Sequence, residues 1–179
     1  MYSKILVPLD GSEIAECSLE HVKEIAVGCH IPEVIIMTVV EPVSDGIPGF
    51  WGAVAGAQTQ MEGQTKGATT AAIDYEKMRA EQLSAASEKK QSELAGGYIT
   101  GVAARLIKEG LNVSTCVVPG EAADTIIDYA AKNGVDIIVM ATHGRSGAAR
   151  WDFGKVADRV IRTSSVPVLI VSPKGCRIQ

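Results

Sequence analysis

Five short segments of the chain are apolar almost throughout and rich in valine and isoleucine. A strand covered on one face alternates apolar and polar residues, whereas a strand covered on both faces is apolar along its length. The pattern therefore predicts the strands of a buried parallel sheet. The five segments are Lys4–Pro8, Val34–Val40, Val113–Val118, Asp136–Ala141 and Val166–Ser172.

Helical patterns lie between these predicted strands. Apolar residues recur there at spacings of three and four, which places them on one stripe of a helix. Ser12 is suited to cap the first helix, and Gly110 is suited to end the second. The alternation of strands and helices predicts a doubly wound α/β fold with right-handed crossovers.

The segment Gly46–Ala72 has neither helical nor strand periodicity. It contains six glycines and two charged residues, and it includes Phe50 and Trp51. We predict a flexible insertion after the second strand, which either folds over a site or contacts a partner. Removing these 27 residues from 179 leaves 152, a normal size for one α/β domain, so we expect a single domain over residues 1–179.

The segment that follows the insertion is charged and favours a helix. Glutamate, lysine, glutamine, alanine and arginine dominate Asp74–Leu94. We expect it to extend the second helix beyond the edge of the domain, with a kink or break at Gly96 and Gly97.

Composition and charge limit the classes of partner. The net charge of −4 argues against a general nucleic-acid binder, which would show a basic surface. No apolar run approaches the roughly 20 residues that span a bilayer, and Asp10 comes too early for a secretory signal. The four cysteines stand far apart, which favours reduced cytosolic thiols over a disulfide framework or a zinc site. We therefore expect a cytoplasmic protein without a membrane partner.

Two predicted strand ends carry unusual residues. Asp10 follows the first strand, and the loop from Thr142 to Gly154 follows the fourth. Ligands of open α/β sheets bind beyond the carboxyl ends of strands, where the strand order reverses, so both loops would meet there if these strands are neighbours. Asp10 either accepts hydrogen bonds from a ribose hydroxyl or a base, or it bonds nearby backbone N–H groups as a turn residue.

The loop after the fourth predicted strand has the composition of an anion site. Its glycines let backbone N–H groups approach a phosphate, and Gly154 precedes a helix N-terminus. Arg145, Arg150 and Lys155 supply positive charge. His143 has no suitably spaced histidine near it, so we interpret it as a hydrogen-bonding loop residue and predict no metal site.

Several of these segments together resemble the universal stress protein family, in particular its ATP-binding branch. The resemblance covers almost the whole chain. It implies a five-stranded parallel sheet in the order 3-2-1-4-5 within a single three-layer α/β/α domain. It also implies a homodimer formed through the last strand, Val166–Ser172. The matching segments are residues 5–12 (ILVPLDGS), 118–120 (VPG), 135–147 (VDIIVMATHGRSG) and 165–171 (SVPVLIV).

ATP-binding members of this family carry the pattern G-x2-G-x9-G-[S/T]. The four positions are here Ala141, Gly144, Gly154 and Lys155, so the first and the last depart from the pattern. Ala141 adds a methyl group where the backbone would approach phosphate, and Lys155 replaces a hydroxyl with a cation. The residues that the resemblance places around the nucleotide are Pro8, Leu9, Asp10, Val39, Met140, Ala141, His143, Gly144, Arg145, Gly154, Lys155 and Val156.

The resemblance implies a stress-associated protein that binds ATP, ADP or AMP, with or without Mg²⁺, and acts as a dimeric sensor or switch. One alternative is a family member that binds no nucleotide and acts by dimerisation and partner contact; the departures at Ala141 and Lys155 motivate it. The other is a slow ATPase. Efficient catalysis is not expected, because the sequence offers no obvious general base, no GxSxG elbow and no Walker pattern.

Overall fold

The computed structural model describes residues 2–41, 70–142 and 153–172, and of residues 70–84 it describes only the course of the helix. It contains a five-stranded sheet in the order β3-β2-β1-β4-β5, in which all neighbouring strands are parallel. The predicted doubly wound α/β fold and its strand order are thus confirmed. The strands are β1 (Lys4–Pro8), β2 (Glu33–Val40), β3 (Val113–Pro119), β4 (Ile137–Ala141) and β5 (Val168–Val171).

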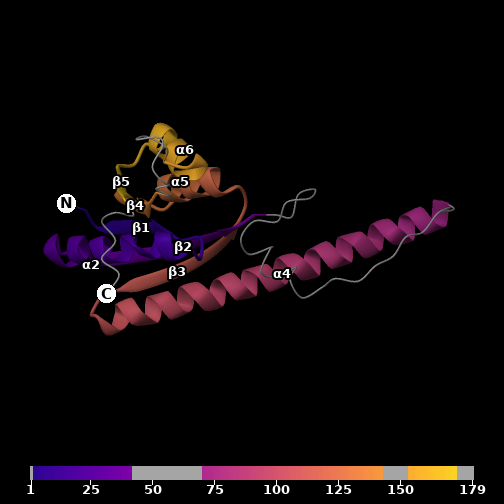
Figure 1. Ribbon diagram of the computed structural model, residues 1–179, viewed down its shortest axis with the longest axis horizontal. Helices are drawn as coiled ribbons and strands as arrows, with labels where there is room; N and C mark the ends of the chain where they lie inside the picture. Colours follow the sequence, from indigo (N-terminus) through magenta and orange to yellow (C-terminus); the bar gives the residue numbers. More distant parts are fainter. Residues whose placement is uncertain (1, 42–69, 143–152, 173–179) are drawn as a thin grey trace.

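Helices cover both faces of the sheet (Figure 1). One face carries α1 (Glu13–Glu16), α2 (Ser18–Gly28) and α4 (Thr70–Lys108), and the other carries α5 (Ala122–Lys132) and α6 (Lys155–Thr163). Strand β1 presents Ile5 and Val7 to the first group of helices and Leu6 to the second, and none of the three is exposed to solvent. Burial on both faces explains why the strands are apolar throughout.

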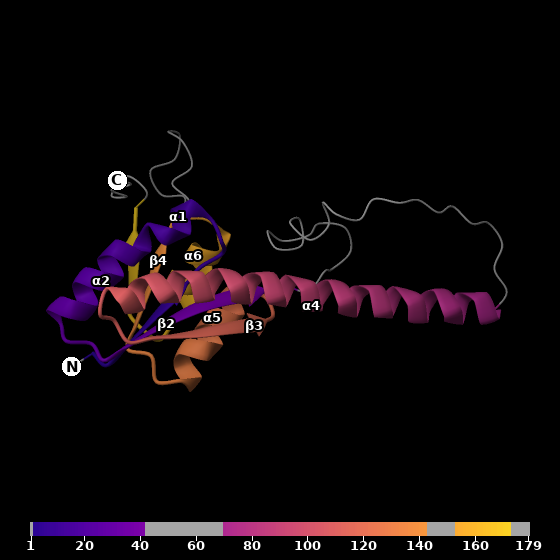
Figure 2. The same cartoon turned by 90° about the horizontal axis from the view of Figure 1, so that it is seen from below.

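Helix α4 is a single helix of 39 residues that runs far past the edge of the sheet (Figures 1 and 2). The predicted extension is observed, but the break expected at Gly96 and Gly97 is wrong, because the helix continues through both. A glycine costs a helix only about 1 kcal/mol, and Ala95 and Ile99 are buried on either side. Although α4 is long, no helix in the described ranges is apolar enough to cross a membrane.

The structure also changes expectations about Cys17 and about the insertion. The first predicted helix is divided at Cys17 into α1 and α2. Cys17 is disulfide-bonded, so the expectation of reduced thiols is wrong for this residue, while Cys29 and Cys116 are free.

The predicted insertion at Gly46–Ala72 overlaps the first turn of α4, and the rest of it lies outside the described residues.

Gly120 links β3 to α5 in a conformation that suits glycine. Its φ is +145°, and a Cβ added there would clash with Thr125 Oγ1. Its N–H donates to the carbonyl of Val40 at 3.1 Å, which fixes the turn against β2. We expect Gly120→Ala to lower the free energy of unfolding by about 1–3 kcal/mol, measured by urea denaturation.

Gly97→Ala is the matched control for this substitution. Gly97 lies within α4, and a Cβ added there would have nothing within 4 Å. Alanine favours the helix over glycine, so this change should raise the free energy of unfolding by about 0.5–1 kcal/mol. Effects of the same sign at both glycines would contradict the argument from backbone conformation.

Candidate functional site

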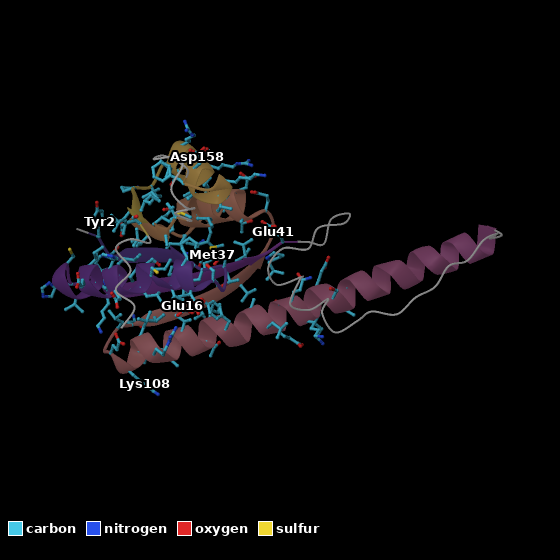
Figure 3. All side chains as sticks on the ribbon, in the orientation of Figure 1. Tyr2, Glu16, Met37, Glu41, Lys108 and Asp158 are labelled. Atoms are coloured by element: carbon cyan, nitrogen blue, oxygen red, sulfur yellow. The ribbon has the colours of Figure 1, made fainter. Side chains whose placement is uncertain are left out.

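A cavity of about 450 Å³ opens at the carboxyl ends of β1, β2 and β4, beside α1, α5 and α6. The strand order reverses at this point, because β1 has β2 on one side and β4 on the other. Met37, which belongs to the wall, lies in the middle of the domain (Figure 3). The lining residues are Pro8, Leu9, Asp10, Ile14, Ala15, Met37, Val39, Ile126, Met140, Ala141, Phe153, Gly154, Lys155, Val156 and Ala157.

Nine of the twelve predicted ligand contacts line this cavity. They come from four parts of the chain that are distant in sequence: the end of β1, β2, the end of β4 and the start of α6. His143, Gly144 and Arg145 lie outside the described residues, and their role stays a prediction. The nine are Pro8, Leu9, Asp10, Val39, Met140, Ala141, Gly154, Lys155 and Val156.

Two hydrogen bonds hold the loop after β1 against β2. The N–H of Leu9 donates to the carbonyl of Met37 at 2.8 Å, which continues the strand pairing by one residue. The buried hydroxyl of Thr38 donates to the carbonyl of Leu9 at 3.0 Å. Buried hydrogen bonds of this kind make a segment rigid, so the chain leaves β1 in a fixed direction and brings Asp10 to the cavity wall.

Asp10 carries the one acidic side chain in the described part of the wall. Its Oδ1 accepts the N–H of Ser12 at 2.9 Å and the Ser12 hydroxyl at 2.6 Å. Ser12 Oγ in turn accepts the N–H of Ala15 at 3.1 Å, which confirms Ser12 as the cap of α1. The interpretation of Asp10 as a turn residue is therefore confirmed, whereas its contact with a ribose or a base remains a prediction.

Helix α6 begins at the cavity. Its N-cap residue, Gly154, has a φ of +80°, which glycine adopts without strain. The first residues of the helix, Lys155, Val156 and Ala157, line the wall. The first N–H groups of a helix lack partners within it and carry the positive end of its dipole, so they favour an anion. Lys155 adds positive charge, and no ion pair among the described residues engages it.

Six apolar residues of the wall were not predicted from the sequence. Met37 could have been found from Val39, because side chains two apart on a strand point to the same face. The others continue apolar patterns that also build the core, so the sequence gives no signal that separates the two roles. The six are Ile14, Ala15, Met37, Ile126, Phe153 and Ala157.

The chemistry of the wall suits one kind of ligand. Apolar side chains can enclose a flat, weakly polar ring, and the start of α6 with Lys155 can hold an anionic group. Asp10 can accept hydrogen bonds from hydroxyl or amino groups. Within the described ranges, no cluster of three or more histidine, cysteine, aspartate or glutamate residues could hold a metal ion.

The strand order and the cavity define the class of protein: a doubly wound α/β protein with a ligand-sized cavity at its switch point. A model of the Universal stress protein family matches residues 1–172. The chain therefore belongs to the universal stress protein family, as the sequence resemblance implied.

Relatives cover almost the whole chain. Universal stress protein MJ0577 of Methanocaldococcus jannaschii is 30% identical over 178 residues, which are 98% of each chain. Its solved structure matches with a TM-score of 0.64 at 27% identity, covering 96% of each chain. A universal stress protein solved in complex with cAMP matches at 18% identity with a TM-score of 0.52, covering 96% of this chain and 98% of the other. A family protein of Arabidopsis thaliana solved with AMP bound matches at 12% identity with a TM-score of 0.54, covering 95% of this chain and 91% of the other.

Proposed function

We propose that the cavity binds an adenine nucleotide, and that the protein is a cytosolic, stress-associated sensor or switch for ATP, ADP or AMP, with or without Mg²⁺. The observation that carries the proposal is the convergence of nine residues from four distant parts of the chain on one cavity of about 450 Å³. Membership of the universal stress protein family supports it. So do the cAMP and AMP complexes of proteins with the same fold.

The wall suggests how the nucleotide lies. The adenosine moiety contacts Asp10 and the apolar residues around it, and the backbone of Val39 meets the edge of the adenine ring. The phosphates lie at the start of α6, where Lys155 and the N–H groups of the first turn supply positive charge. Ala141 adds one methyl group to this wall, which narrows the space beside the phosphates relative to the glycine of the family pattern.

We also propose a homodimer formed through the last strand, Val166–Ser172. Strand β5 lies at the edge of the described sheet, and Val168, Leu169 and Ile170 are only half-buried there. An edge strand presents unpaired N–H and C=O groups beside these apolar side chains, which favours pairing with another strand. A second copy of the chain would cover this edge.

Co-purified ligand and calorimetry test the proposed nucleotide binding. The purified protein is denatured and the released small molecules are identified; ATP, ADP, AMP and cAMP are then titrated into ligand-free protein. We expect binding of at least one of them. Failure of all four to bind at millimolar concentration would overturn the proposal and leave partner contact as the function of the fold.

Lys155→Ala tests the placement of the phosphates. We expect this variant to weaken ATP binding about three- to tenfold and adenosine binding less than twofold, because one favourable charge interaction with the phosphates is lost. Lys132→Ala is the control, since Lys132 is exposed on α5, pairs with Asp128 and does not line the cavity. An unchanged ratio of ATP to adenosine affinity in Lys155→Ala would show that Lys155 faces away from the phosphates.

A further inference from the structure

Helix α1 lies between the cavity and helix α4. Two of its four residues, Ile14 and Ala15, line the cavity. The next residue, Glu16, belongs to a shallow groove between α2 and α4 instead. Figure 3 shows Glu16 between the ribbons of these two helices. Helix α1 therefore touches the ligand site with one side and α4 with the other.

Both carboxylate oxygens of Glu16 are bonded to α4. The hydroxyl of Tyr98 donates to Oε1 at 3.0 Å, and Nη2 of Arg105 donates to Oε2 at 2.5 Å. Tyr98 and Arg105 lie seven residues apart, which is about two helical turns. Their side chains therefore lie on the same face of α4, and both donate to Glu16. We call Glu16, Tyr98 and Arg105 the α1 clamp.

The surroundings of Tyr98 keep its hydroxyl a donor. Its ring is half-buried against the core that α2 and α4 share with the sheet. Burial, followed by the charge of Glu16, raises the pKa of Tyr98 well above its usual value. The charge of Asp10 in the cavity wall acts in the same direction, and that of Arg105 opposes it. The phenol therefore stays protonated and donates its hydrogen bond to Glu16.

A helix as short as α1 needs such support. Isolated helices shorter than about 12 residues are marginal in water, because few hydrogen bonds repay their nucleation. At its start, α1 is held by the cap that runs from Asp10 through Ser12 to Ala15. At its end, Cys17 joins it directly to α2, and the side chain of Glu16 ties it to α4. Loss of the bonds of Glu16 would remove the side-chain contacts that fix α1 against α4, and would loosen the part of the wall that Ile14 and Ala15 form.

We propose that Glu16 is a positioning residue for the ligand site: through Tyr98 and Arg105 it fixes α1, and with it one wall of the cavity, against α4. The expected effect of Glu16 on affinity rests on the proposed nucleotide binding, whereas its effect on the position of α1 does not. If a ligand binds only when α1 is packed against α4, it binds more weakly when only a fraction of the protein molecules have α1 in that position. Because coupling is reciprocal, bound nucleotide should also tighten the contact between α1 and α4.

The chain offers a matched control in the same groove. Lys23 of α2 pairs with Glu109 of α4, and both line the groove beside Glu16 and Arg105. This ion pair also joins a helix to α4, but it does not touch α1. Lys23→Ala therefore removes a contact with α4 and leaves the α1 clamp intact.

Adenosine titration and amide hydrogen exchange test the proposal on the full chain. We expect Glu16→Ala to weaken adenosine binding about three- to tenfold and to speed exchange of the α1 amides, with Glu16→Gln intermediate because it keeps an acceptor for Tyr98. Tyr98→Phe added to Glu16→Ala should have little further effect on affinity, since both act through one contact. Lys23→Ala should change neither readout.

The two readouts separate this proposal from the proposed function. If the parent protein binds no nucleotide, the proposed function fails, and faster α1 exchange in Glu16→Ala but not in Lys23→Ala still supports the positioning role. If Glu16→Ala leaves α1 exchange unchanged, the positioning role is overturned whatever the affinity. Equal loss of affinity in Glu16→Ala and Lys23→Ala would overturn it as well, because a general loosening of α4 would then explain the result.

Discussion

Replacing Asp10 with alanine is expected to weaken the binding of adenosine, AMP and ATP by a similar factor, on the order of ten- to a hundredfold, which is the usual range for losing hydrogen bonds to a charged group. The three ligands should respond alike because the proposed contact is with the nucleoside that they share. Asp10 lies in the cavity wall, and its carboxylate is the one acidic side chain in the described part of that wall. Isothermal titration of each ligand against both proteins measures the effect.

Ser12→Ala separates the two roles of Asp10. Asp10 also holds Ser12, whose hydroxyl caps α1, so Asp10→Ala disturbs the loop as well as the ligand contact. Ser12→Ala removes the cap and leaves the carboxylate of Asp10 in the wall. We expect a loss of affinity several times smaller than in Asp10→Ala. Equal losses in both variants would mean that Asp10 acts only by shaping the loop, and equal affinity in Asp10→Ala and the parent would refute the contact altogether.

Ile99→Ala is expected to lower the free energy of unfolding by about 2–5 kcal/mol, the usual cost of truncating a buried isoleucine and leaving a cavity. Ile99 lies on α4 and is 1% exposed, packed in the core between this helix and the sheet. The substitution should loosen the whole domain, because α4 covers β2 and β3. Urea denaturation followed by circular dichroism measures the change.

Ile107→Ala is the matched control on the same helix. Ile107 lies two turns further along α4 and is 53% exposed. Its truncation should change the free energy of unfolding by no more than about 0.5 kcal/mol. A similar cost at both positions would mean that the C-terminal half of α4 is not anchored through the face that carries Ile99.

The strands could be predicted because a strand buried on both faces is apolar along its whole length, and such a run is visible in the sequence. Strand β1 was predicted at its observed bounds, and β2 and β4 were within one residue of theirs. The last strand was predicted from Val166 but begins at Val168. The N–H of Val166 is instead bonded to Ser164 Oγ at 3.0 Å, and proline at position 167 has no N–H to donate. Local turn bonds of this kind leave no periodic signal.

The candidate site was predictable in part. Asp10, Gly154 and Lys155 stand out at the ends of elements, where polar or conformationally special residues break an apolar pattern. The family resemblance added Val39 and Met140, which look like core residues. The remaining apolar wall could not be found, because a residue such as Ile126 packs into the core and lines the cavity with the same side chain.

The projection of α4 has a mechanical consequence. At a rise of 1.5 Å per residue, the stretch from Tyr98 back to Thr70 is about 40 Å long. It is one uninterrupted helix whose anchored part carries Ile99 and Tyr98, and whose far part lies beyond the sheet (Figure 2). The segment of α4 packed on the sheet is short, and the segment that extends beyond the sheet is long, so a small rotation of the packed segment moves the far end by a larger distance. A tilt of about 5° at Tyr98 would carry Thr70 sideways by roughly 3.5 Å, so a displacement too small to break any contact in the core would become a displacement of atomic size at the tip.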